Sequence, residues 1–149
     1  MRKILYAMQF KGRASVAAED NQLLRATGSA PSCTLRTSIG SGGVESDMKP
    51  AEGDMAFLES ELRLTGPESY REEGTISFGE NDNVLRFASS EGHLLRSPNP
   101  ETMAGSSTWT VEGGKGQFAA ARGFIVSTFT LSDAGELSDF HCGLIFLPE

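Results

Sequence analysis

Short alternations of apolar and polar residues recur along the chain, and clusters of Gly, Pro, Asn, Asp and Ser separate them. A period of two is typical of β-strands that bury one face. Because no helical pattern lies between the segments from residue 54 onward, they predict an antiparallel meander, and closure into a barrel would hide its edge strands. The segments are DMAFLESELRLTG, SYREEGTISFGE, NVLRFASS, STWTVEGG, QFAAARGFIVSTFTLSDAG and ELSDFHCGLIFL.

The first third of the chain is less regular. The segments KILYAMQF at 3–10 and CTLRTSI at 33–39 are rich in strand formers and predict two strands. Between them, SVAAEDNQLLRA at 15–26 fits a helix or an irregular segment. Residues 40–53 combine turn residues with few apolar side chains, so we expect a flexible loop there. The whole chain, residues 1–149, has the length of one domain.

Alternation assigns each strand residue to a face of the sheet. In residues 56–64 the side with three leucines should point inward and the charged side outward. Two carboxylates beside a guanidinium resemble an acid–base site, but a solvated strand face explains them, so they are not selected as a site. The inward set is Leu58, Ser60, Leu62 and Leu64, and the outward set is Phe57, Glu59, Glu61 and Arg63.

The last segment, residues 136–147, contains a histidine directly before a cysteine. Neighbours on a strand point to opposite faces, so His141 and Cys142 cannot form a Cys–His dyad. One face carries Asp139, His141, Gly143 and Ile145, and the other carries Phe140, Cys142, Leu144 and Phe146.

Charge and cysteine content exclude several classes of function. The net charge is −7, with six basic and sixteen acidic residues in positions 52–149, and this acidity opposes binding to nucleic acid or to an anionic membrane. The two cysteines, Cys33 and Cys142, form no C-x-x-C pair and no zinc pattern, so we expect two buried, reduced thiols and no metal site. Charges at Lys11 and Arg13 interrupt any signal-peptide core, which predicts a cytoplasmic protein.

A glycine-rich stretch at 113–116, GGKG, resembles a phosphate-binding loop only superficially. A P-loop needs G-x-x-x-x-G-K-[ST] opening onto a helix, whereas here Gln117, Phe118 and a strand-forming run follow. We therefore predict a turn between two strands, in which the glycines serve backbone geometry, Phe118 is packed and Lys115 is solvated. No nucleotide or other cofactor motif occurs elsewhere, so no cofactor is expected.

The remaining chemistry is acid–base or non-covalent chemistry inside a barrel. A structural role competes with a functional one for each candidate, because Tyr and Trp often only pack, Glu is often solvated and a lone His is often structural. The candidates are Tyr70, Glu72, His93, Trp109 and His141.

Two stretches, ESYREEGTISFGENDNVLRF at 68–87 and STWTVEGGKGQFAAARGFIVSTF at 107–129, resemble the allene oxide cyclase and dirigent barrel superfamily. In that group a strand ending S-F-G precedes a hairpin, and G-G-x-G-x-F-x-x-x-x-G joins two later strands. The resemblance implies an all-β fold: a closed antiparallel eight-stranded barrel, calycin-like, with a central apolar cavity. The matching positions are Gly113, Gly114, Gly116, Phe118 and Gly123.

The resemblance also implies a candidate site. Tyr70 aligns with an aromatic residue that lines the pocket of allene oxide cyclases. In the first strand, Ala7 stands where those enzymes have a carboxylate, and Gln9 stands where they have an amide. The predicted catalytic residues are Gln9, Tyr70, Glu72 and His93, and the predicted substrate-binding residues are Tyr6, Ile76, Phe78, Trp109 and Phe124.

The implied function is that of a cofactor-independent cyclase or isomerase. Its barrel would fold a small hydrophobic, conjugated substrate before ring closure, as bacterial barrels of this type do in natural-product biosynthesis. A non-catalytic carrier of a small hydrophobic ligand and a structural module share the same strand pattern. The expected partners are the substrate and further copies of the chain, in a dimer or trimer.

Overall fold

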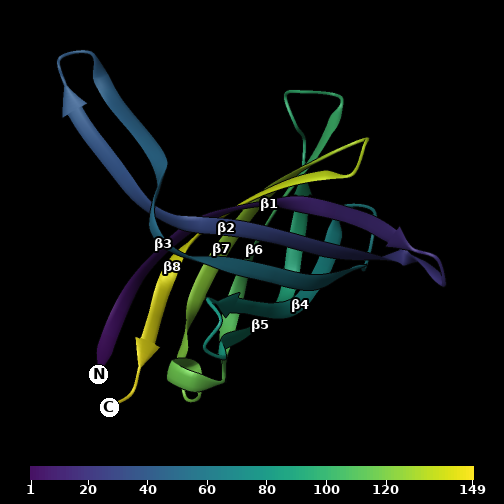
Figure 1. The fold of residues 1–149 in the computed structure, drawn as a ribbon. Helices are drawn as coiled ribbons and strands as arrows, with labels where there is room; N and C mark the ends of the chain where they lie inside the picture. Colours follow the sequence, from purple (N-terminus) through teal and green to yellow (C-terminus); the bar gives the residue numbers. More distant parts are fainter.

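The fold consists of eight antiparallel strands and one short helix. A computed structural model describes residues 1–149, apart from the side chain of Ser90. The strands pair in chain order, and the first pairs with the last, so the hydrogen-bonded ring is closed. The elements are β1 (Arg2–Ala17), β2 (Asp20–Gly40), β3 (Gly43–Leu64), β4 (Ser69–Phe78), β5 (Asn83–Leu95), β6 (Thr102–Gly114), the 3-10 helix η1 (Gly116–Phe118), β7 (Arg122–Ser132) and β8 (Glu136–Leu147) (Figure 1).

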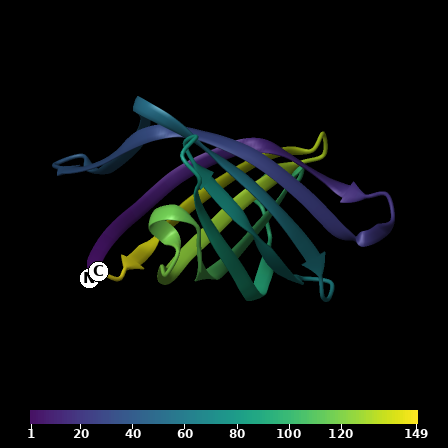
Figure 2. The same ribbon diagram turned by 60° about the horizontal axis from the view of Figure 1, so that its bottom comes forward.

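The ring closes between β1 and β8. Their register runs from Arg2 opposite Leu147 to Arg13 opposite Glu136. The two chain ends therefore lie side by side, as Figures 1 and 2 show, and the Met1 amino group pairs with Glu149 at 2.6 Å. The prediction of an all-β antiparallel sheet that hides its edges by closing on itself is confirmed for this ring.

The first third of the chain differs from the expectation. Residues 15–26, expected to be helical or irregular, belong to β1 and β2, joined by a turn at 18–19. Residues 40–53, expected to be a loop, lie mostly in β3, and a turn at 41–42 joins β3 to β2. Backbone pairing between Ile39 and Val44 and their neighbours forms this hairpin, and such pairing needs no apolar run. The low content of apolar residues therefore led to a wrong prediction of a loop where the chain forms a strand.

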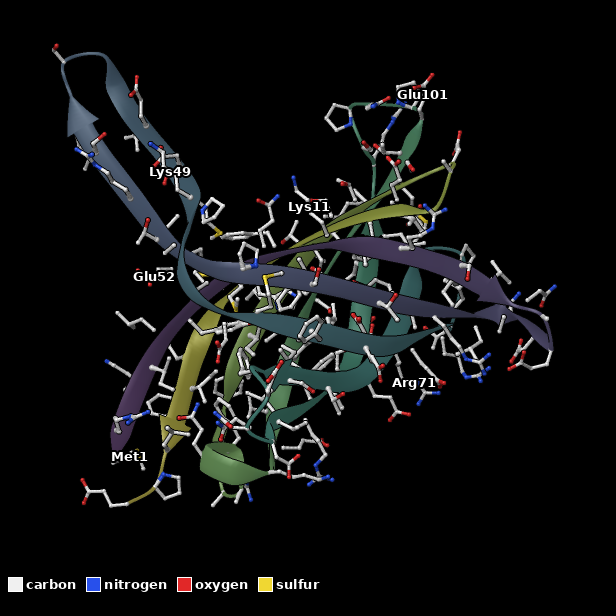
Figure 3. All side chains as sticks on the ribbon, in the orientation of Figure 1. Met1, Lys11, Lys49, Glu52, Arg71 and Glu101 are labelled. Atoms are coloured by element: carbon white, nitrogen blue, oxygen red, sulfur yellow. The ribbon has the colours of Figure 1, made fainter. Side chains whose placement is uncertain are left out.

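The hairpin formed by residues 33–50, called the arm below, makes the ring uneven. It begins at a register shift after Pro31 and projects away from the ring (Figure 1). Lys49 lies on the arm and Glu52 at its base, whereas Lys11 lies on the adjacent wall (Figure 3). The two strands of the arm pair with each other, so the arm contributes nothing to the interior.

The interior of the ring has two apolar clusters. One is tightly filled and surrounds Trp109 at the end that holds the chain termini, and we call it the filled half. The other surrounds Tyr70 and Phe129 at the opposite end, and we call it the hollow half. On β3 the inward face predicted from alternation is confirmed, since Leu58, Ser60 and Leu62 are all buried.

A band of buried polar side chains separates the two halves. On β3 the inward series runs from Leu58 through Ser60 to Leu62, and on β7 it runs from Ile125 through Ser127 to Phe129. Each strand thus changes from apolar to polar to apolar along its inward face. We call this band the polar belt; its members are Ser60, Glu72, Ser89, Ser107, Ser127, Asp139 and His141.

The link between β6 and β7 is the glycine-rich stretch. It contains η1, whose Phe118 is buried, while Lys115 is exposed. The glycines at 113, 114, 116 and 123 all have positive φ angles. The prediction that these glycines serve backbone geometry around a packed Phe118 is therefore confirmed, although the turn is longer than a tight hairpin.

Candidate functional site

Asp139, an inward residue of β8, is the hub of the polar belt. Its Oδ1 accepts a hydrogen bond from the Ser127 hydroxyl at 2.6 Å. Its Oδ2 lies 3.0 Å from Nε2 of His141, and both side chains are buried. A buried carboxylate needs such donors, because an unpaired charge in an apolar interior is strongly unfavourable. These contacts hold Asp139 in one orientation.

His141 extends this chain of hydrogen bonds to Tyr6 on β1. The Tyr6 hydroxyl lies 3.0 Å from Nδ1 of His141. Burial, together with the charge of Asp139, raises the pKa of Tyr6 well above its ordinary value, so the phenol keeps its proton. When Tyr6 donates its hydrogen bond to Nδ1, the imidazole proton is on Nε2, and the Nε2–H donates a hydrogen bond to Asp139. The tautomer of His141 is thereby matched to Asp139.

Glu72 on β4 is the second carboxyl of the belt. Its Oε1 accepts the indole N–H of Trp109 at 3.2 Å. Trp109 is fixed in turn by stacking on Phe87, with ring centroids 3.6 Å apart. Burial, and secondly the charge of Asp139, raises the pKa of Glu72 to about 8, while Ser60 and then the Trp109 hydrogen bond act in the opposite direction. At neutral pH Glu72 is therefore mostly a carboxylic acid.

An apolar cavity of about 230 Å³ opens beside these two carboxyls in the hollow half. Most of its wall is aliphatic, and Tyr70, Glu72 and Asp139 bring the polar groups to it. Apolar walls with a few converging polar groups are the usual composition of a small-molecule site. The wall comprises Ala14, Val16, Asn21, Leu24, Ala26, Leu62, Leu64, Tyr70, Glu72, Leu94, Met103, Phe129, Leu131, Leu137 and Asp139.

The Tyr70 hydroxyl is buried without a hydrogen-bond partner among the described residues. Burial, with smaller effects of the charges of Glu72 and Asp139, raises its pKa. Ser107 lies near enough to oppose this shift, but the two hydroxyls do not meet in hydrogen-bond geometry. Most buried polar groups in proteins are paired, so an unpaired phenol at a cavity wall needs an explanation.

The local sequence of β4 and β5 positions Tyr70 and Glu72. They are two residues apart on β4, so both point inward. The register with β5 shifts between them, from Tyr70 opposite Gly92 to Glu72 opposite Ser89. A Cβ at Gly92 would overlap with the Tyr70 ring, so glycine there leaves the space that the ring occupies. The shift in register places Gly92 opposite Tyr70, where the absence of a side chain makes room for the aromatic ring.

Three residues predicted from the sequence lie outside this site. Gln9 is exposed on the outer face, where its amide donates to Ser138 at 3.2 Å. His93 is exposed and lies 3.9 Å from Glu91. Phe124 is 58% exposed, because Gly123 and Ile125 take the inward positions on either side. None of the three lines the cavity.

The other predicted residues are inside the ring. Tyr70 and Glu72 line the cavity, as described above. The predicted substrate-binding residues Tyr6, Ile76, Phe78 and Trp109 belong to the filled half or pack against it. Trp109 hydrogen-bonds to Glu72, and Tyr6 hydrogen-bonds to His141, so these two residues support the polar belt. None of the four residues lines the cavity.

Comparison with known proteins gives no assignment. No protein-family model, curated protein or solved structure matches the chain. The chemistry of the site has to follow from the geometry of the polar belt and the cavity.

Asp139 and Ser127 were not among the residues predicted from the sequence, and His141 was only one of several candidates. The sequence does contain a signal for them. Each lies an even number of positions from an inward apolar residue of the same strand, such as Phe129 on β7 or Ile145 on β8, and so shares its face. On β8 the outward face contains more apolar residues than the inward face, so hydrophobicity alone favours the wrong side. The alternation on β7 is clear enough to assign its inward face, and pairing β7 with β8 would then have assigned the inward face of β8.

Other surfaces offer less chemistry. A groove of about 650 Å³ near Glu61, Arg63, Arg71 and Glu112 is larger than the cavity but is open and charged, and it reaches Glu72 and Ser89 of the polar belt. Among the described residues, no group of three His, Cys, Asp or Glu side chains could hold a metal ion. In the same residues no helix is long and apolar enough to cross a membrane.

The two cysteines are unpaired with each other. Cys33 is half-buried, and its thiol lies 3.4 Å from the Ala7 carbonyl oxygen. Cys142 is exposed on the outer face of β8. The expectation of two buried thiols is therefore wrong for Cys142, because the inward positions of β8 belong to its neighbours His141 and Gly143.

Proposed function

We propose that this protein is a cofactor-independent isomerase or cyclase that moves a proton on a small, mostly apolar molecule held in the cavity. One observation carries the proposal: two buried carboxyls line the same apolar cavity, Glu72 with its pKa raised by burial and Asp139 held by hydrogen bonds to Ser127 and His141. Paired groups whose environments separate their protonation states are the usual arrangement for acid–base catalysis.

The two carboxyls take different roles in this proposal. Asp139 accepts two hydrogen bonds and acts as the base. Glu72 stays protonated in its buried position and stabilises developing negative charge on the substrate by donating a hydrogen bond. Apolar walls exclude water and orient the substrate, which favours one reaction path of a flexible molecule. Proton transfer of this kind needs no cofactor, and it can shift a double bond or start a ring closure.

The test uses unsaturated ketones, aldehydes and esters of about eight to twelve carbons, a size suited to the cavity. In D2O, at least one of them should take up deuterium or rearrange in the presence of the protein, as measured by mass spectrometry. Glu72→Gln and Asp139→Asn should each slow this reaction by about 100-fold or more. Glu73→Gln, the adjacent exposed position on β4, is the matched control and should not change the rate.

The alternative function is non-catalytic binding of a small hydrophobic ligand. It would be supported if a compound bound in the cavity and was recovered unlabelled and unchanged. Kinship with the allene oxide cyclase and dirigent barrels, and a calycin-like barrel as the finer description of the ring, are part of the same proposal. The glycine motif in the link between β6 and β7 supports that kinship.

We also propose that copies of the chain associate through the arm. One face of the arm is apolar, with Leu35 opposite Met48 and Ile39 opposite Val44. The other face is polar, with Arg36 opposite Asp47. An isolated two-stranded hairpin is marginally stable in water, so its apolar face needs a partner. A second outward apolar surface, formed by Leu5, Phe124, Val126, Phe140 and Leu144, lies on β1, β7 and β8 of the same chain. The residues named on both surfaces are uncharged, so their contact places no like charges opposite each other.

Self-association can be measured by light scattering after size-exclusion chromatography. The wild-type protein should have the mass of a dimer or larger assembly. Replacing Leu35, Ile39 and Val44 together by Thr preserves strand propensity but removes the apolar face, and should give a monomer. Arg36→Thr on the polar face is the control and should leave the assembly intact. A wild-type monomer at micromolar concentration would refute this proposal.

A further inference from the structure

The Tyr70 hydroxyl is the starting point for a more specific assignment of the cavity. It is an O–H donor on a fully buried side chain, and no described residue accepts its hydrogen bond. Tyr70 also lines the cavity, so an acceptor can come from a molecule bound there. An unsatisfied donor of this kind is costly unless it has a role in binding.

Glu72 offers a second donor at the same wall. Its Oε1 is occupied by the Trp109 N–H, and the nearby Ser60 hydroxyl, which acts to lower the Glu72 pKa, does not meet it in hydrogen-bond geometry. Since the carboxyl is protonated at neutral pH, its O–H can donate into the cavity. Tyr70 and Glu72 are two positions apart on β4 and point to the same side. The same wall of the cavity therefore contains two side chains that can donate an O–H hydrogen bond, at neighbouring inward positions of β4.

Asp139 presents the opposite chemistry. It lies near enough to raise the pKa of both Tyr70 and Glu72, and it lines the same cavity. Ser127 and His141 hold its two oxygens, so its orientation is fixed before a ligand enters. A fixed base that lines the same apolar cavity as two donors is complementary to a carbonyl compound with an acidic C–H.

We propose, building on the proposed function, that Tyr70 and Glu72 form an oxyanion hole and that the substrates are small enolisable ketones or aldehydes. The carbonyl oxygen accepts hydrogen bonds from both residues. Asp139 removes a proton from the adjacent carbon. The C–H electrons form a carbon–carbon double bond, and the carbonyl π electrons move onto oxygen, which becomes an enolate.

The enolate then has two balanced outcomes. In an isomerisation, Asp139 returns its proton to a different carbon of the conjugated system, and the oxygen becomes a carbonyl again. In a ring closure, the enolate carbon attacks a second carbonyl carbon of the same molecule, the π electrons of that carbonyl move onto its oxygen, and the resulting alkoxide takes the proton from Asp139. Neither outcome needs an oxidant, a reductant or a second substrate.

A phenolate has the same oxygen charge and planar geometry as an enolate, so 4-nitrophenol tests the oxyanion hole without turnover. At neutral pH the wild-type protein should bind it as the anion, visible as the yellow phenolate absorption. Tyr70→Phe and Glu72→Gln should each weaken this binding at least about tenfold, because each removes or weakens a charge-assisted hydrogen bond. Asp139→Asn should leave it unchanged or tighten it, since a nearby negative charge is removed.

Two controls separate this proposal from a folding defect. Nitrobenzene has the same ring and nitro group but lacks the phenolic oxygen. Its affinity for the protein, measured by NMR titration, should therefore be the same for Tyr70→Phe as for the wild type. Glu73→Gln should bind 4-nitrophenol like the wild type. The proposal is overturned if 4-nitrophenol does not bind, if it binds as the neutral phenol, or if Tyr70→Phe and Glu72→Gln both bind it as tightly as the wild type.

The two proposals fail in different experiments. Deuterium uptake that depends on Asp139, without phenolate binding at Tyr70 and Glu72, would preserve the isomerase and eliminate the oxyanion hole. Tight phenolate binding that depends on both residues, without deuterium uptake by any carbonyl compound, would preserve the oxyanion hole as a binding site and eliminate the isomerase.

Discussion

Replacing Glu72 by Gln should remove a large pH dependence from the stability of this protein. The wild-type free energy of unfolding should fall by about 4 to 5 kcal/mol more than that of Glu72→Gln between pH 4.5 and pH 9. The two proteins should be similarly stable near pH 4.5. Chemical denaturation of both proteins at several pH values measures the difference.

The physical reason is the raised pKa of Glu72. Its pKa is 4.5 for an unperturbed side chain and about 8 in the folded chain, chiefly because of burial. Between these values the folded chain holds a proton that the unfolded chain has released. Unfolding in this interval therefore releases a proton, so rising pH favours the unfolded state. Glutamine does not titrate, yet its carbonyl oxygen can still accept the Trp109 N–H.

The comparison isolates Glu72 from the other groups of the polar belt. Asp139 and His141 face the same interior and are present in both proteins, so the two chains differ in one ionisable group. Glu73→Gln, on the exposed face of β4, should have the same pH profile as the wild type. Parallel wild-type and Glu72→Gln profiles would show that the carboxyl is ionised in the folded chain, and the role of Glu72 as a hydrogen-bond donor would then be lost.

Replacing Gly123 by Ala should destabilise the protein by about 3 to 5 kcal/mol. Gly123 is the last glycine of the motif and has a φ of 150°, a conformation that residues with a side chain rarely adopt. A Cβ there would overlap with the Leu144 carbonyl oxygen and meet the Ile145 Cα at 3.0 Å. Both neighbours are backbone atoms of β8, so relief requires moving a strand of the ring.

The control for this change is Gly42→Ala in the turn of the arm. A Cβ at Gly42 has no neighbour within 4 Å, so its effect should stay within about 0.5 kcal/mol. Thermal or chemical unfolding of both variants provides the measurement. Equal stabilities for Gly123→Ala and Gly42→Ala would mean that the glycine motif does not determine the path of β7 against β8.

The sequence predicted the fold class well because alternation on individual strands is a local signal. Leu58, Ser60 and Leu62 were assigned to the correct face from spacing alone. The arm was missed because residues 40–53 carry few apolar side chains, and strand pairing there depends on the partner strand. Strand pairing over such a segment is a non-local property that composition does not report.

The site was predicted only in part, and the reason is again geometric. Tyr70 and Glu72 share a face by parity, and the structure brings both to the cavity. Gln9 is next to the buried Phe10 and therefore points outward, while the irregular register before Gly92 breaks simple alternation near His93. Asp139 meets Glu72 across the ring from a strand 67 positions later in the chain, and no local pattern indicates such a meeting.

The polar belt divides the ring into parts that can change independently. The filled half, with Trp109 stacked on Phe87, fixes the positions of Glu72 and His141 from one side. The hollow half on the other side is lined mainly by aliphatic residues that make no hydrogen bonds to the belt. Exchanging these residues for larger or smaller ones can reshape the cavity while Glu72 and Asp139 stay in place. The shape of the cavity can therefore change by point mutation without moving the two carboxyls.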